Sequence, residues 1–377
     1  MIRLKTSSLF HKLIVLLTFF TIMTPADSLG VKKILLFLTI TYGLLIDRKF
    51  SKHIKTVIFL FLGLMTLILF SLFNGSSLGA SLSIIYPFIY ILVGLMSADM
   101  KVAFENIFSK ILLFLSLIIV GTAILDMAHL VSISSNSLMN YIIMLGEGQI
   151  SVSNDAIFHY VIFLNGSPLI LYNVAKYGFK QKYMLLIISV LGLFFSGTRA
   201  NIYMALVILV IVVLFALKNL LISIFTILIG ASTFELFKLK SQSINQAKSG
   251  GDYARELKLE VIQSELGSNI RNWMFGKGLG SYYYGPEKRI FNVIQYGYVN
   301  TSEWSYMELI RQAGVIGLVI VMIIIVKPLI TLLSQRQYYP VVGVVSYLIV
   351  ATVDPFLITS TGFILYAVTY YLCKRKD

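Results

Sequence analysis

The chain has 377 residues, of which 58% are hydrophobic and only 13% are charged. Its mean hydropathy of +0.86 is that of a polytopic membrane protein and excludes a soluble globular enzyme. The formal net charge of +14 is accompanied by no nucleic-acid motif. We therefore attribute the charge to membrane topology and expect no nucleic-acid partner.

Long apolar runs without strict alternation predict helices and not a β-barrel, because backbone groups in lipid must be hydrogen-bonded internally. In chain order, these runs predict spans at 10–26, 31–46, 54–73, 80–97, 110–130, 156–175, 182–195, 200–217, 219–237, 306–326, 339–353 and 355–372. The sequence thus predicts an all-α polytopic fold of about twelve transmembrane helices, with eleven or thirteen as alternatives. No small-x-small cleavage site follows the first run, so we expect an uncleaved helix there and not a signal peptide.

Basic residues alternate with the predicted spans. The segments predicted to lie inside contain Arg3, Lys5, Lys12, Arg48, Lys49, Lys52, Lys55, Lys101, Lys110, Lys176, Lys180, Lys182, Lys218, Lys327, Arg336, Lys374, Arg375 and Lys376. The short segments predicted to lie outside contain only Lys32, Lys33 and Arg199. This positive-inside pattern predicts that both termini are cytoplasmic.

One long polar segment, residues 238–305, interrupts the apolar sequence, and we call it the insert. It divides the chain into nine predicted spans at 1–237, the insert itself, and three predicted spans with a cytoplasmic tail at 306–377. Both tryptophans of the chain lie in it, together with the run Tyr282–Tyr284. Disordered linkers are poor in aromatic residues, so we expect the insert to be folded and functional on the outer side.

Two local patterns can be read within the insert. Asp252 is a plausible N-cap for a helix to about Leu266, and the stripe formed by Tyr253, Leu257 and Val261 predicts that this helix lies on the membrane surface.

The second pattern is Gly276–Gly280, in which glycine alternates with other residues. Here Gly278 and Gly280 permit a tight turn or a close approach to a phosphate. The tyrosines that follow have flat faces that suit pyranose rings or the bilayer interface equally well.

Arginines on the predicted outer side are the first candidate site residues. Arg199 lies in Ser196–Asn201, where a guanidinium must find an anionic partner or extend to the lipid headgroups. Arg255 begins the predicted surface helix, and Arg271 follows one loop later, although either could be a simple surface charge.

The second candidate region is Glu303–Gly317, where the insert returns to the membrane. Glu303 and Arg311 are eight residues apart, so on a continuous helix they lie on roughly one face. Gly314 and Gly317 allow close helix packing.

These residues resemble the O-antigen polymerases (Wzy type) and the related O-antigen ligases. The resemblance rests on the Ser-Gly-Thr-Arg opening at 196–199, the arginines and Gly-x-Gly of the insert, and the acid…Gly-x-x-Gly return to the membrane. The motifs cover about 196–203 and 250–317, while the predicted topology matches over most of the chain. The histidine of the ligase motif is replaced by Glu303-Trp304, and its leucine by Tyr203, so the resemblance favours the polymerases.

The resemblance implies a membrane glycosyltransferase that joins undecaprenyl-pyrophosphate-linked oligosaccharide repeat units at the periplasmic face of the bacterial inner membrane. It implies catalytic roles for Arg199, Arg255 and Glu303, with Glu303 either the base or a structural partner of an arginine. It further implies substrate-binding roles for Arg271, Arg289, Arg311, Trp304, Tyr306, Gly278 and Gly280.

We expect no cofactor and no metal, because no outward carboxylate pair is present to hold a divalent ion. The lipid bilayer is an expected partner, and a chain-length regulator and a flippase of the same pathway are candidate partners. Two alternatives remain open, a ligase-like glycan transferase and a lipid-linked oligosaccharide flippase or transporter. A transporter is less favoured because Asp126, Glu235 and Asp354 all fall toward the ends of predicted spans.

Overall fold

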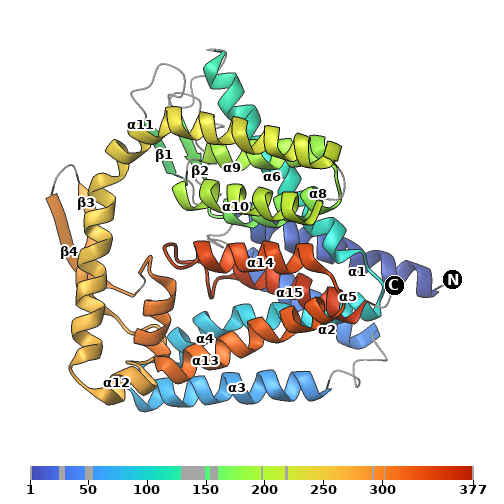
Figure 1. Ribbon diagram of the computed structural model, residues 1–377. Helices are drawn as coiled ribbons and strands as arrows, with labels where there is room; N and C mark the ends of the chain where they lie inside the picture. The colour runs from blue at the N-terminus through green and yellow to red at the C-terminus, as the bar shows by residue number, and fades with distance from the viewer. Residues whose placement is uncertain are drawn as a thin grey trace.

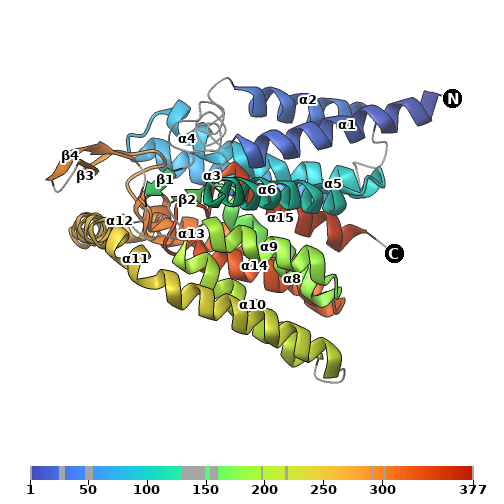
Figure 2. The same cartoon turned by 90° about the horizontal axis from the view of Figure 1, so that it is seen from above.

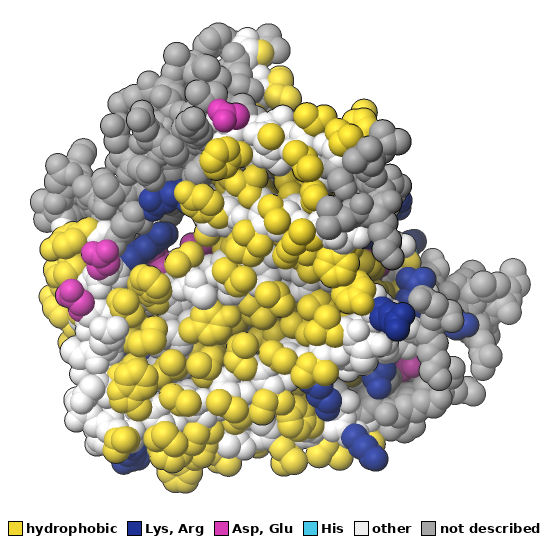
Figure 3. Space-filling model, viewed as in Figure 1, with side chains coloured by type: hydrophobic (Ala, Val, Ile, Leu, Met, Phe, Trp, Pro, Cys, Tyr) yellow, Lys and Arg dark blue, Asp and Glu magenta, His cyan; other side chains and the backbone are white. Residues whose placement is uncertain are grey.

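The computed structural model describes residues 2–24, 30–46, 54–128, 149–152, 160–196, 198–216, 220–290, 293–300 and 302–375. Its helices run side by side in one bundle, and both chain termini lie at the same end of that bundle (Figures 1 and 2). Figure 3 shows hydrophobic side chains over the flank of the bundle, with many Lys and Arg side chains at the end that carries the termini.

The part of the chain before residue 217 is mainly helical. Its helices are α1 (Ile2–Met23), α2 (Val31–Ile46), α3 (Ile54–Phe73), α4 (Leu78–Ile85), α5 (Tyr90–Asp99), α6 (Phe104–Met127), α8 (Ile170–Phe179), α9 (Tyr183–Ser196) and α10 (Arg199–Ala216). The 3₁₀ turns η2 (Tyr86–Ile89) and η3 (Ser167–Leu169) lead directly into α5 and α8. The strands β1 (Gln149–Val152) and β2 (Tyr160–Phe163) form an antiparallel pair.

The rest of the chain includes the insert. Its elements are α11 (Leu220–Gly267), α12 (Ile270–Phe275), the antiparallel strands β3 (Tyr283–Ile290) and β4 (Val293–Val299), α13 (Ser305–Ser334), α14 (Tyr338–Val350) and α15 (Ser360–Lys374). Helix α11 first lies along α10 and then turns across the ends of other helices (Figure 1). The predicted start of the insert at 238 and the predicted N-cap Asp252 therefore both lie inside a helix. No proline interrupts 220–267, which is compatible with a helix over this whole range.

Several helices are suited to a bilayer. Among the described residues, four helical stretches are long and apolar enough to cross a membrane, namely Ile54–Phe73, Leu78–Asp99, Phe104–Leu125 and Ser305–Ser334. Shorter apolar helices occupy Ser8–Met23, Tyr183–Ser196, Arg199–Phe215, Ile224–Glu235 and Tyr338–Val350. This arrangement is consistent with an α-helical membrane protein, and the number of twelve spans stays a prediction.

One predicted span, 156–175, is not a helix along its whole length. Tyr160–Phe163 form strand β2, in which Phe163 pairs with Gln149 of β1. Tyr, Val, Ile and Phe suit strands as well as membrane helices, and an apolar run alone does not distinguish the two. The predicted all-α fold therefore also contains short β-hairpins, while residues 156–159 lie outside the described part of the chain.

The most deeply buried helix is α15. Its residues Ser360–Leu372 are all buried, and α5 packs directly against it. A Cβ on Gly94 would lie 2.1 Å from the carbonyl oxygen of Ala367, so the two backbones approach closely only because residue 94 is glycine. Small residues are a general means by which membrane helices pack in this way.

The insert is joined to α13 where that helix is broken. Gly314 has φ 71° and ψ 178°, which is not helical, and the carbonyl oxygens of Arg311 and Gln312 consequently lack intrahelical partners. The backbone N–H groups of Lys277 and Gly278 donate to these oxygens at 2.7 and 2.9 Å. The backbone break at Gly314 therefore lets α13 bind the insert through these two hydrogen bonds. This role is additional to the helix packing that was predicted from Gly314 and Gly317.

The insert also has a small hydrophobic core. Ile262 and Leu266 of α11 pack with Tyr283 of β3, and Val261 lies against this cluster. Tyr253, by contrast, is largely exposed. The buried face of α11 therefore includes residues one position further along than the predicted stripe. It packs against the chain's own hairpin and against Met307 and Ile310 of α13.

Candidate functional site

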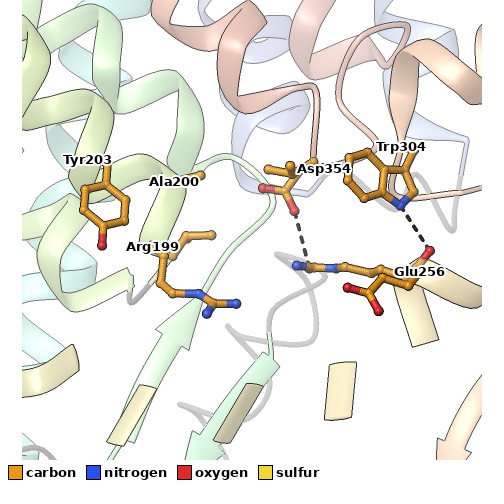
Figure 4. Close-up of a pocket in the computed structure, with 9 residues that line it drawn as sticks. Arg199, Ala200, Tyr203, Glu256, Trp304 and Asp354 are labelled. Atoms are coloured by element: carbon orange, nitrogen blue, oxygen red, sulfur yellow. Dashed lines mark hydrogen bonds and ion pairs between the residues drawn. The ribbon is translucent and has the colours of Figure 1, made fainter. Parts of the chain in front are cut away.

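A pocket lies where the start of α10, the insert and the turn after α14 meet, at the end of the bundle away from the termini (Figures 1 and 4). Its volume is about 440 Å³. The lining residues are Thr198, Arg199, Ala200, Tyr203, Arg255, Glu256, Trp304, Val353 and Asp354. Three of the predicted site residues, Arg199, Arg255 and Trp304, are thus brought together by separate parts of the chain.

Arg199 is the first residue of α10. The Nδ2 group of Asn201 donates to the hydroxyl of Thr198 at 3.1 Å, which orders the start of the helix. Residue 197 lies outside the described part of the chain. In Figure 4 the Arg199 side chain extends from α10 into the space below Asp354, with Tyr203 one turn further along the helix. The helix N-terminus and the guanidinium both contribute positive potential at this side of the pocket.

Arg255 of α11 lines the opposite side of the pocket. Its Nε group donates to the carboxylate of Glu303, and its Nη2 group lies 3.9 Å from Oδ1 of Asp354. The indole Nε1 of Trp304 donates to the backbone carbonyl of Arg255 at 3.1 Å (Figure 4). Arg255 and Arg199 therefore line one cavity, while their roles in catalysis stay predictions.

Glu303 is not among the residues that line the pocket. Its carboxylate forms an ion pair with Arg255, and both side chains are about one-third exposed. This is the alternative that the sequence left open, in which Glu303 orders an arginine at the return of the insert. A role as the catalytic base stays a prediction, but this position does not favour it.

Asp354 is the carboxylate that sequence reasoning missed. It is buried, lines the pocket and faces Arg255. The hydroxyl of Ser305 donates to its backbone carbonyl and so ties the start of α13 to the turn after α14. The sequence could have indicated Asp354, because it is an acid followed by proline between two apolar runs. An acid near the membrane is a functional candidate by default.

Arg311 does not reach the pocket, so its predicted substrate-binding role is corrected. Its side chain is 0% exposed, and it donates to both carboxylate oxygens of Glu308, at 3.1 and 2.7 Å. It also donates to the hydroxyl and backbone carbonyl of Ser281, and it lies 4.7 Å from the ring centre of Tyr283. Burial, and next the Glu308 carboxylate, raise the pKa of Tyr283 to about 12. Arg311 therefore attaches the insert to α13.

The glycine segment has a structural role instead of the predicted phosphate-binding one. Each of its four N–H groups at 277–280 donates to a protein acceptor: Lys277 to Arg311 O, Gly278 to Gln312 O, Leu279 to Ser71 Oγ and Gly280 to Gln312 Oε1. Gly278 and Gly280 have φ of 103° and 73°. A Cβ on Gly278 would lie 2.1 Å from Ser76 Oγ. These glycines therefore let the segment pack closely against residues 71–80, and their N–H groups do not face a ligand.

The remaining predicted site residues lie elsewhere. Arg271 is exposed on α12, where its Nη2 donates to Asn74 at 3.4 Å, and it is not among the residues that line the pocket. The hydroxyl of Tyr306 donates to the carbonyl of Leu348 at 3.0 Å and joins α13 to α14. The side chain of Arg289 lies outside the described residues.

The arrangement combines two guanidinium groups with a buried carboxylate. Within the lining, Arg199 and Arg255 are balanced by Glu256 and Asp354, so an incoming anion would compete with these acids for the cations. The 3.9 Å separation of Arg255 from Asp354 exceeds hydrogen-bond length. That contact is therefore weaker than the hydrogen-bonded pair with Glu303 and easier to exchange for a phosphate oxygen.

Comparison with models of known protein families found no match to this chain, and a search of curated proteins found no similar sequence.

Proposed function

We propose that this chain is a membrane glycosyltransferase of the O-antigen polymerase type. Its substrates would be oligosaccharide repeat units linked to undecaprenyl pyrophosphate, joined at the periplasmic face of the bacterial inner membrane. The observation that carries the proposal is that Arg199 and Arg255, from two different helices, line one pocket at the end of the bundle away from the termini.

Two arginines in a partly enclosed pocket suit a pyrophosphate ester. The planar guanidinium binds two oxygens of a phosphate at once, which an ammonium cannot do. Glu303 and Trp304 hold Arg255 by its Nε group and its backbone carbonyl, so its orientation is fixed before substrate binds. Charge that is already oriented stabilises a transition state without the cost of reorganisation.

The surface of α10 supports a lipid-linked substrate. Tyr203 lines the pocket, and it is followed on the same face by the exposed apolar side chains of Val207, Val210 and Leu214. These positions are three or four residues apart, so they form one stripe along the helix. A polyprenyl chain could lie on this stripe in the bilayer while its pyrophosphate occupied the pocket.

In the proposed reaction, a hydroxyl oxygen of the acceptor sugar forms a bond to the anomeric carbon of the donor. The bond from that carbon to the pyrophosphate oxygen breaks, and its electron pair leaves with the lipid pyrophosphate. Arg199 and Arg255 would stabilise this developing charge. Asp354 would accept the hydroxyl proton, because it lines the pocket while Glu303 does not. The scheme uses no metal and no cofactor.

The charge distribution supports the proposed orientation. Lys and Arg side chains lie at the end with the termini (Figure 3), and the sequence concentrates basic residues in the segments predicted to be cytoplasmic. The pocket would then face the periplasm, where lipid-linked glycans are the available sugar donors.

A direct experiment uses the purified chain in lipid nanodiscs with a synthetic undecaprenyl-pyrophosphate repeat unit. A ladder of lipid-linked oligomers, accompanied by release of undecaprenyl pyrophosphate, is the expected result. Absence of both products at saturating substrate would overturn the proposal. The matched control for the pocket is Arg271→Ala, because Arg271 is an exposed arginine of the same insert outside the pocket.

A gene deletion separates the proposal from its alternatives. Loss of a polymerase leaves the lipid A–core capped with one repeat unit, while loss of a ligase or a flippase leaves none. The single-repeat cap is the expected phenotype. An uncapped core, restored by the wild-type gene, would move the assignment to one of the other two classes.

A further inference from the structure

The β3–β4 hairpin exposes an unusual number of tyrosines on one face. Tyr283 points inward and is 1% exposed, while its neighbours Tyr282 and Tyr284 are 63% and 58% exposed. On β4, Tyr296 and Tyr298 are 48% and 75% exposed. Because side chains alternate between the faces of a strand, Tyr284, Tyr296 and Tyr298 share the face opposite Tyr283.

The rings of the three exposed strand tyrosines form a contiguous cluster. Tyr284 and Tyr298 are directly paired across the strands, with ring centres 5.5 Å apart. The rings of Tyr284 and Tyr296 lie 6.1 Å apart at an angle of 29°. We call Tyr284, Tyr296 and Tyr298 the tyrosine face.

The tyrosine face is supported from behind by the helix that carries Arg255. Tyr283 packs on Ile262 and Leu266 of α11, and it also contacts the buried Arg311. Arg255 and Ile262 are seven residues apart on this helix, which corresponds to about 10 Å along its axis. The hairpin is therefore within reach of an extended chain whose end occupies the pocket.

The hairpin also lies outside the bundle. In Figure 1 it lies on the far side of α11, and in Figure 2 it lies beside α11; in both views it extends past the ends of the bundle helices. A face that served as a bilayer anchor would lie level with the ends of those helices. The position of the tyrosine face thus favours an occupant in the aqueous compartment.

We propose that the tyrosine face binds the carbohydrate chain of the substrate or product by stacking on its pyranose rings. The proposal rests on the proposed function, which it deepens by assigning a second contact for the glycan outside the reaction pocket. A tyrosine offers an apolar ring to the C–H groups of a sugar and a hydroxyl to its oxygens, without a charge that would require an ionic partner. Large exposed aromatic clusters on soluble surfaces mark binding sites.

The test measures glycan binding directly. The probe is the surface polysaccharide of the native host, freed of lipid by mild acid, and the protein is the full chain in nanodiscs. Saturation-transfer NMR and titration would compare wild type with Tyr284→Ala/Tyr298→Ala, Tyr284→Phe/Tyr298→Phe and Tyr253→Ala. The last variant is the matched control, because Tyr253 is 57% exposed on α11 and lies outside the hairpin.

The double alanine variant is expected to bind roughly tenfold more weakly, since two stacking rings are removed. The phenylalanine variant should retain most of the binding, and Tyr253→Ala all of it. The three residues changed, Tyr253, Tyr284 and Tyr298, are all exposed. Thermal unfolding of each variant at the wild-type temperature checks that folding is intact. Unchanged binding in the alanine variant would overturn the inference, as would equal losses in the alanine and phenylalanine variants. If the alanine variant kept glycan binding but bound liposomes less well than wild type, the face would be assigned to the membrane instead. If it kept glycan binding but no longer cross-linked to a protein that wild type cross-links, the face would be assigned to that protein partner.

The inference and the proposed function can fail separately. A wild-type protein that polymerises the synthetic repeat unit without binding the polysaccharide would overturn this inference alone. A wild-type protein that binds the polysaccharide through the tyrosine face, yet makes no polymer, would overturn the proposed function alone. Arg255→Ala should lose polymerisation and keep polysaccharide binding, because the pocket and the tyrosine face are separate sites.

Discussion

The guanidinium of Arg255 contacts two carboxylates, and the two contacts differ in geometry. The Nε group is hydrogen-bonded to Glu303, whereas Nη2 is 3.9 Å from Asp354. A hydrogen-bonded ion pair restrains a side chain more strongly than a purely Coulombic contact does. We therefore assign Glu303 to positioning and Asp354 to the pocket chemistry.

The first prediction concerns the two pocket arginines. Arg199→Ala and Arg255→Ala should each lower the initial rate of polymerisation by about a hundredfold, the usual cost of losing one electrostatic contact to a transition state. Arg199→Lys should recover little activity, because an ammonium makes no bidentate contact. Rates are measured on the synthetic lipid-linked repeat unit, with Arg271→Ala as control and immunoblots for abundance. A wild-type ladder of product lengths from both alanine variants would remove these arginines from the site.

The second prediction separates the two acids. Asp354→Asn should lower the rate by about 10²–10⁴-fold, the range for loss of a positioned base. Glu303→Gln should stay within about tenfold of wild type, because the amide oxygen still accepts a hydrogen bond from Arg255 Nε. Both variants keep the side-chain shape, and the measurement is the initial rate across pH. The reverse order of effects would return the role of base to Glu303.

At the scale of elements, the insert is held by backbone contacts that depend on glycine. Gly276 and Gly314 lie where the two chain segments cross, and both have positive φ. The break in α13 releases two carbonyl oxygens, and the N–H groups of Lys277 and Gly278 satisfy them. Since a buried polar backbone group without a partner is costly, the broken helix and the docked insert depend on each other.

The third prediction follows from this crossing. A Cβ on Gly314 would lie 2.1 Å from the carbonyl oxygen of Met274, and φ of 71° is itself strained for any side chain. Gly314→Ala should therefore lower the thermal midpoint in detergent by the equivalent of roughly 1–3 kcal/mol or more, and expose the insert to protease. Gly121→Ala in α6 is the control, because nothing lies within 4 Å of the added Cβ. Equal midpoints for the two variants would contradict the close crossing.

At the scale of the whole molecule, the bundle has two chemically different ends. One end carries the termini and many basic side chains (Figure 3), and the other carries the pocket, α12 and the β3–β4 hairpin (Figure 1). In a bilayer these ends would face different compartments, because the apolar flank between them suits the hydrocarbon core.

The fourth prediction tests that orientation. Cys373 is the single cysteine of the chain, so Cys373→Ser provides a cysteine-free background. In this background, a cysteine introduced at exposed Tyr284 should react with a membrane-impermeant maleimide in intact spheroplasts. A cysteine at exposed Arg336, in the turn between α13 and α14, should react only after permeabilisation. Labelling of both positions from one side would contradict the proposed topology.

Sequence patterns predicted most of the apolar helices, because burial of backbone polar groups in lipid permits few alternatives to a helix. The ends of α2 and α3 agree with the predicted runs 31–46 and 54–73. The pattern failed at β2, where the run Tyr160–Phe163 pairs with β1, since hydrophobicity alone does not determine the hydrogen-bond partner. The predicted helix from Asp252 to about Leu266 is confirmed as part of α11, but the sequence did not predict that the helix is continuous through 238–252.

The candidate site was predictable only in part. Arg199 was identified because a cation near the membrane needs an anionic partner, and that requirement can be read from local composition. Arg255 was identified from the family resemblance. Whether a given arginine faces the pocket or the protein interior depends on residues distant in sequence. Arg311 is hydrogen-bonded to Ser281 and Glu308 in the interior. Asp354 comes near Arg255 across a long sequence separation, and Ser305 joins the turn after α14 to the start of α13. The sequence alone determined the residue types and the apolar segments. Tertiary packing decided which charged side chains are in contact, because the strength of an ion pair depends on distance and burial in space and not on separation along the chain.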